Sequence, residues 1–161
     1  MQDFPLEIME LPIGVELYHG TNSCEEFDYP DPPAWFSDGY EVAKFFADYH
    51  DTKCDDQEKY PIRRIFTYIT KYNLNLILIN NSDDIDILND YFGVCDHYDL
   101  VDAICAAGFD GWNIPSNYPE GADIVLCNLP GDSLELVEIE MLGRINPSFL
   151  SWFEEIERGE N

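Results

Sequence analysis

Apolar and polar positions alternate along several short stretches of the chain, and this period of two predicts β-strands. Residues 15–19 alternate in this way and run into Gly20, as a half-buried strand that ends in a turn would. Other stretches alternate or form short apolar runs, and we expect strands there too: residues 34–37, 63–69, 75–79, 109–114, 122–126 and 134–139.

Apolar residues at helical spacing predict helices between and after these strands. The first opens at Ser37-Asp38, and its apolar face consists of Val42, Ala43, Phe46 and Ala47. The others are expected over residues 83–91, over 98–107 with Gly108 as the C-terminal cap, and from Asn146-Pro147 to Ile156.

The predicted strands and helices do not alternate as βαβ units would, which favours an α+β fold with antiparallel strands. The chain has 161 residues, of which 45% are hydrophobic, so it is long and apolar enough to bury a core. It has no internal repeat, low-complexity tract or linker. We therefore expect a single domain over residues 1–161.

The charge of the chain is strongly negative, with 33 acidic and 8 basic side chains and a formal net charge of −25. Such a field repels phosphates, which disfavours direct binding to nucleic acids or membrane surfaces. Residues 1–16 lack the basic region and apolar core of a signal peptide, and no stretch approaches the ~20 apolar residues of a membrane helix. We expect a cytoplasmic protein.

The cysteines at positions 24, 54, 95, 105 and 127 are odd in number and widely spaced. None forms the Cys-x-x-Cys pair of a zinc site or redox dithiol, so we expect reduced thiols, several of them in the core, and no metal. Cys105 and Cys127 lie in apolar runs without a recognisable nucleophile signature. A hydrolase that pairs one of them with His19 is therefore disfavoured.

Two segments have the side chains of a ligand site. In His19-Gly20-Thr21 an imidazole at a strand end is followed by a glycine, whose bare backbone lets a flat ligand approach. The segment Trp35-Phe36-Ser37, followed by a helix with Phe46 and Tyr49, can form an aromatic wall for a planar or cationic ring. Each has a purely structural alternative, since His19 can be structural, Ser37 a helix cap, and Trp35 and Phe46 core residues.

A third segment contributes carboxylates just before the strand expected at 122–126. Glu120 and Asp123 follow the Gly108 to Trp112 stretch, and a carboxylate there can stabilise an oxocarbenium-like ribosyl cation. We prefer Glu120 as the catalytic group, with Asp123 close enough to take its place.

These three segments, in this order, resemble the ADP-ribosyltransferase superfamily, and in particular its His-Tyr-Glu branch and small phage-encoded members. The resemblance covers residues 15–139 and implies split antiparallel β-sheets flanked by helices. It also implies an enzyme that uses NAD as a co-substrate, mono-ADP-ribosylates a protein and releases nicotinamide. NAD glycohydrolase activity, with water as the acceptor, is the related possibility.

The resemblance also implies roles for individual residues. His19 would hydrogen bond the adenosine ribose, Gly20 would pair its backbone with the nicotinamide carboxamide, and Thr21 would support the turn. Phe46 stands where the family has a stacking tyrosine, and Glu120 where it has the catalytic glutamate. Phe46 lacks the phenol hydroxyl, which Tyr49 can supply, and Tyr118 stands where arginine-modifying members have Glu or Gln.

The charge raises two further expectations. The anionic pyrophosphate of NAD needs local cations or backbone N–H groups, and Lys44, Arg63 and Arg64 are the candidates. The acceptor is expected to be a protein, and a basic nucleic-acid-binding protein suits the field. The alternative function is an acidic binding protein that occupies a basic partner surface as a DNA mimic does, with little or no catalysis.

Overall fold

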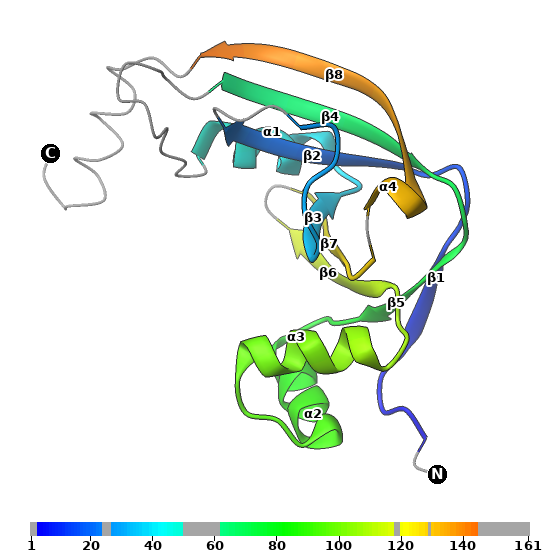
Figure 1. Cartoon of the computed structure of the whole chain (residues 1–161). Helices are drawn as coiled ribbons and strands as arrows, with labels where there is room; N and C mark the ends of the chain where they lie inside the picture. The colour runs from blue at the N-terminus through cyan, green and yellow to red at the C-terminus, as the bar shows by residue number, and fades with distance from the viewer. Residues whose placement is uncertain (1–2, 24–26, 50–61, 118–119, 129, 145–161) are drawn as a thin grey trace, which may run out of the picture.

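A computed structural model describes residues 3–23, 27–49, 62–117, 120–128 and 130–144. These residues form eight strands and four helices (Figure 1). In chain order they are β1 (Ile8–Leu11), β2 (Glu16–Ser23), β3 (Ala34–Ser37), α1 (Tyr40–Tyr49), β4 (Ile62–Thr70), β5 (Leu74–Leu78), α2 (Ser82–Phe92), α3 (His97–Ala106), β6 (Gly111–Asn117), β7 (Glu120–Leu126), α4 (Pro130–Ser133) and β8 (Leu134–Arg144).

The strands form one mixed, mostly antiparallel sheet in the order β1-β5-β6-β7-β3-β2-β4-β8. The predicted α+β class is therefore confirmed. One pair, β5 and β6, is parallel. This pair departs from the antiparallel expectation because α2 and α3 carry the chain from the end of β5 back to the start of β6, as a parallel connection requires.

The sheet has a seam between β2 and β3. These strands share a single residue pair, Tyr18 with Ser37, whereas β2 pairs with β4 along its whole length and β3 pairs with β7 along all four of its residues. The seam divides the sheet into a β2 half (β2, β4 and β8) and a β7 half (β1, β5, β6, β7 and β3).

The main hydrophobic core joins the two halves. Leu17, Phe66 and Tyr68 of the β2 half are buried in one cluster with Phe36 and Ile124 of the β7 half. Since burial of large apolar side chains is the main stabilising force in folding, this cluster stabilises the junction of the two halves, where β2 and β3 share few hydrogen bonds.

The helices cover other parts of the sheet. α2 and α3 pack on β5, β6 and β7 through a second cluster that includes Leu88, Ile104 and Trp112, and Figure 1 shows them at the end of the molecule away from β8. α1 packs on the β2 half through Ala43 and Ala47. No helix in the described ranges is long and apolar enough to cross a membrane.

The predicted elements that the structure describes agree with it in their order and type, with shifts at their ends. The turn predicted at Gly20 is wrong, because β2 continues through Gly20 to Ser23 and pairs with β4 along that length. His19 and Thr21 therefore lie within a strand, not at its end. Strand β1 and the short helix α4 were not predicted. Helix α3 ends at Ala106, Ala107 is still right-handed, and the predicted cap Gly108 follows with the left-handed φ of 94°. The helix predicted from Asn146-Pro147 to Ile156 lies outside the described residues.

The prediction that all cysteines are reduced thiols is wrong for two of them. Cys105, near the end of α3, and Cys127, just after β7, form a disulfide. Packing of α3 on the sheet brings their Cα atoms to 5.4 Å, within the range that a disulfide bridges. Sequence spacing could not reveal this, because 22 positions separate the two residues. Cys95 is free and exposed.

Candidate functional site

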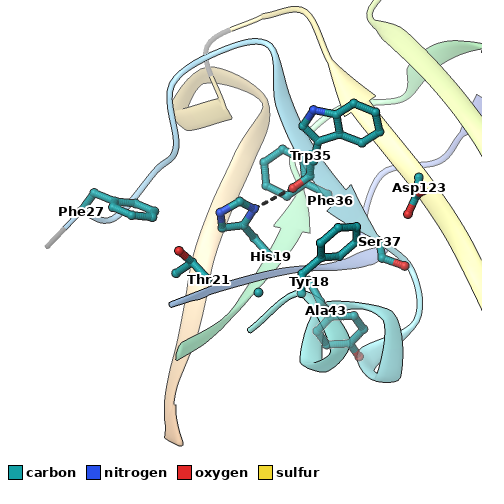
Figure 2. Close-up of a pocket in the computed structure, with 11 residues that line it drawn as sticks. Tyr18, His19, Thr21, Phe27, Trp35, Phe36, Ser37, Ala43 and Asp123 are labelled. Carbon is teal, nitrogen blue, oxygen red and sulfur yellow. Dashed lines mark hydrogen bonds between the residues drawn. The ribbon is translucent and has the colours of Figure 1, made fainter. Parts of the chain in front are cut away.

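A pocket of about 510 Å³ opens at the seam, between β2, β3, β7 and α1. Its lining is predominantly apolar and aromatic, with a few polar groups, as is typical of small-molecule sites. Figure 2 shows these side chains, which are Tyr18, His19, Gly20, Thr21, Phe27, Trp35, Phe36, Ser37, Ala43, Phe46 and Asp123.

The pocket brings together nearly all of the predicted site residues whose side chains the structure describes. The whole of His19-Gly20-Thr21 and of Trp35-Phe36-Ser37 lines it, as does Phe46 from α1. Trp35 and Phe46 remain 44% and 37% exposed, so neither is the plain core residue of the structural alternative. Residues of β2, β3 and α1 thus meet at one cavity.

Three residues named in the sequence analysis have side chains that the structure does not describe. The side chains of Tyr49 and Glu120 lie outside the described residues, as does Tyr118. The backbone of Glu120 begins β7, three residues before Asp123. The alternative carboxylate, Asp123, lines the pocket.

His19 is fixed by its surroundings. Its Nδ1 lies 2.6 Å from the carbonyl oxygen of Trp35, so Nδ1 is the nitrogen that donates a proton in this bond (Figure 2). Its ring also packs near those of Phe27, Phe36 and Phe66, with centroids 5.7 to 6.1 Å away. The residue therefore links the halves and faces the pocket at once.

Gly20 has a structural reason to be glycine that sequence reasoning missed. A Cβ on Gly20 would lie 1.7 Å from the backbone oxygen of Ala43, because α1 crosses β2 in direct backbone contact. The bare backbone of Gly20 was expected to let a flat ligand approach. It is also required for packing, because only glycine fits against the backbone of Ala43.

The turn between β3 and α1 is fixed by two side chains. The hydroxyl of Ser37 accepts a hydrogen bond from the backbone N–H of Gly39, two residues further on, as in a Ser/Thr turn. Since α1 begins at Tyr40 and its first turn bonds to the carbonyl oxygen of Gly39, Ser37 is not the N-terminal cap of the helix. A carboxylate oxygen of Asp38 accepts from the N–H of Ala122. The first bond stabilises the turn, and the second ties it to β7 beside the pocket.

Asp123 is the carboxylate that lines the pocket. It lies opposite Ser37 in the ladder of β7 and β3. Partial burial raises the pKa of its carboxyl above the ordinary value, because a low-dielectric environment disfavours the charged form. Apart from His19, the lining residues include no basic side chain. A negative charge placed there would interact strongly with positive charge that develops on a ligand.

No family model, curated protein or solved structure matches the chain. The assignment of the pocket therefore depends on its own residues.

The cations proposed for the pyrophosphate are not in the pocket. Arg63 forms an ion pair with Asp48, with 2.8 Å between Nη1 and Oδ1, and also donates to the carbonyl oxygen of Leu142. Arg64 is buried on β4 and Lys44 is exposed on α1, and neither is a lining residue. Within the described residues, no group of three His, Cys, Asp or Glu side chains could hold a metal ion.

Sequence reasoning missed three lining residues, Tyr18, Phe27 and Ala43. Tyr18 and Ala43 are neighbours of predicted positions in β2 and α1, so the segments themselves contained the signal. Phe27 comes from the stretch between β2 and β3, where its ring stacks on that of Phe66 at 5.1 Å. Nothing in its sequence context distinguishes it from other aromatic residues in a loop.

Proposed function

We propose that this protein is an NAD-dependent ADP-ribosyltransferase whose site is the pocket at the seam. The observation that carries the proposal is the convergence of the three predicted segments, since His19-Gly20-Thr21, Trp35-Phe36-Ser37 and the carboxylate of Asp123 all line that pocket.

The arrangement of the sheet supports the same function. ADP-ribosyltransferases are expected to have split antiparallel sheets, and here a single residue pair joins the two halves beside the pocket. The His-Gly-Thr strand belongs to one half, and the strands with Trp35 and Asp123 belong to the other. A ligand at the seam would thus contact both halves.

The lining suits the nicotinamide end of NAD. Trp35 and Phe46 offer exposed aromatic faces on which a cationic pyridinium ring can stack. The imidazole of His19 and the backbone of Gly20 supply hydrogen-bonding groups for a ribose hydroxyl and the carboxamide. These roles for His19 and Gly20 follow from the family resemblance.

In the reaction, the bond between ribose C1′ and the nicotinamide nitrogen breaks, and its electron pair leaves with nicotinamide. Positive charge develops on the ribose, and the nearby carboxylate stabilises it. An acceptor nucleophile then bonds to C1′ and loses its proton. We assign the stabilising role to Asp123, because it is the carboxylate among the residues that line the pocket. Glu120 remains the alternative.

The acceptor that the charge favours is a basic protein, and a nucleic-acid-binding protein has the required surface. The net charge of −25 also supports a second function, in which the chain occupies a basic partner surface without catalysis. Localisation in the cytoplasm stays a prediction, and the Cys105–Cys127 disulfide is more typical of an oxidising compartment.

The test is to incubate the protein with NAD, with and without a basic acceptor such as histone, and to measure free nicotinamide and protein-bound ADP-ribose. Asp123→Asn should lower the rate by at least about 100-fold, and Glu120→Gln much less. The reverse order would transfer the role to Glu120. If the wild-type protein releases no nicotinamide, the enzyme proposal fails.

A further inference from the structure

We propose that the exposed edge of β8 is a docking site for an extended, basic segment of a partner protein, which adds to the sheet as a further strand. Among the described strands, none pairs with β8 on the side away from β4. Figure 1 shows β8 as the outermost strand of its half. An edge strand of this length presents a row of unpaired backbone groups that can pair with another chain.

The usable part of this edge is the stretch Glu138–Met141. The register of β4 with β8 shifts between Arg63 and Arg64 and between Thr67 and Tyr68. Between those two irregularities, the four residues from Glu138 to Met141 pair regularly with β4. Because bulges interrupt pairing at either side, a partner strand would be held in one place along β8.

The two faces of this stretch differ in chemistry. Ile139 and Met141 are 40% and 57% exposed and lie opposite Phe66 and Arg64, on the face of the sheet that includes His19. Glu138 and Glu140 are on the other face. A complementary strand therefore alternates apolar residues with basic ones, so that each basic side chain lies beside a glutamate.

The charge selects the class of occupant. Two copies of this chain would bring glutamates of β8 together, each copy with a net charge of −25, and like charges on adjacent strands are destabilising. A lysine- or arginine-containing segment is attracted instead. The hydroxyl of Tyr40 donates a hydrogen bond to a carboxylate oxygen of Glu140. This bond orients the carboxylate and adds no positive charge beside it.

The docking site is close to the pocket but separate from it. Since strands in a sheet are about 4.8 Å apart, a strand added to β8 would lie about 14 Å from β2, on which His19 and Gly20 are located. A loop next to the docked segment could reach the pocket. The statement that the docked protein is also the acceptor rests on the proposed function, whereas the docking itself does not.

The binding test uses a labelled peptide of alternating lysine and valine and measures its affinity for the full chain by fluorescence anisotropy, without NAD. We expect binding that weakens as salt is raised, and none for a glutamate–valine peptide. Two further peptides are N-methylated at all lysines or at all valines. Because backbone N–H groups alternate between the two sides of a strand, one of these peptides should lose at least about tenfold in affinity and the other should keep it.

Protein variants locate the site. Glu138→Gln should weaken binding about two- to fivefold, whereas Glu10→Gln, an equal change of charge on the opposite edge strand β1, should have little effect. Amide hydrogen exchange of Glu138 to Met141 should slow on the outward side when the peptide binds.

Several results would overturn the proposal. One is the absence of peptide binding, and another is an equal effect of both methylation patterns or both variants, since either would indicate only diffuse charge attraction. If the outward amides of β8 are already protected from hydrogen exchange without the peptide, the chain itself covers the edge. If the protein is a dimer that the peptide dissociates, the occupant is a second copy of the chain. Binding without nicotinamide release would refute only the enzyme function.

Discussion

The imidazole of His19 on β2 donates a hydrogen bond from Nδ1 to the carbonyl oxygen of Trp35 on β3, at a distance of 2.6 Å. It therefore crosses the seam next to the Tyr18–Ser37 pair, the one ladder contact between these strands. Because Nδ1 carries the proton in this bond, the bond also fixes the tautomer and orientation of the ring.

Substitution of His19 separates its two tasks. His19→Phe keeps an aromatic ring among Phe27, Phe36 and Phe66 but removes the hydrogen bond, so we expect the free energy of unfolding to fall by about 1 kcal/mol. NAD affinity should fall more, by about tenfold or greater, because the polar group that faces the ligand is lost. Urea unfolding and calorimetric titration measure the two. Unchanged NAD affinity would show that His19 is only structural.

Gly20→Ala should disrupt the contact of α1 with β2. The added methyl group would meet the backbone oxygen of Ala43 at 1.7 Å, and backbone cannot move aside as a side chain can. We expect a loss of about 3 kcal/mol or a failure to fold. The matched control is Gly131→Ala, whose added methyl group would be 3.7 Å from Tyr29, in ordinary contact. Thermal unfolding of both variants tests this, and equal stability of the two would contradict the described packing.

Asp123→Asn should change how stability depends on pH. The raised pKa means that the folded state binds the proton of Asp123 more tightly than the unfolded state does, so wild-type stability falls as the pH rises through the window between the ordinary and the raised pKa. The amide does not titrate. The stability of the variant relative to the wild type should therefore increase across that window and then stay constant at higher pH. Urea midpoints measured from about pH 4 to about pH 8 test this, and a constant difference would mean that the ionised carboxylate is well solvated.

Loss of the disulfide should weaken the β7 half. The bond closes a loop that contains β6, β7 and Asp123, with a sequence separation of 22 residues, and a loop of that length contributes about 3 kcal/mol. Reduction, or the pair Cys105→Ala and Cys127→Ala, should lower the free energy of unfolding by about this amount. Cys95→Ala, at the exposed free cysteine, is the control and should change little. Stability that does not respond to reductant would mean that the thiols are not bonded in solution.

Most of the secondary structure could be predicted because the hydrophobic periods are local. The strand 34–37 was predicted with the bounds that β3 has, and residues 63–69 fall within β4. Strand β1 was missed because Ile8–Leu11 does not alternate clearly, and its place is determined by pairing with β5. The apolar pattern of β5 predicts a strand there, but it does not show which segment pairs with it.

The site could be predicted in part for the same reason. The His19 and Trp35 segments could be predicted because an imidazole next to a glycine and a run of aromatic residues are local features of the sequence. The seam, by contrast, depends on how β2 and β3 pair, and no pattern of residues in either strand predicts it. The constraint on Gly20 depends on Ala43 and the disulfide depends on the path of α3, so both required the three-dimensional structure.

The narrow junction of β2 with β3 has a mechanical consequence. Bending a continuous sheet strains many hydrogen bonds together, whereas bending this one strains the Tyr18–Ser37 bridge and the His19–Trp35 bond. Rotation of one half against the other therefore strains few hydrogen bonds between strands and works mainly against apolar packing, which is not directional. Because the pocket lies at this junction, such a rotation would change the distance between its two walls while leaving the side chains of each wall in place.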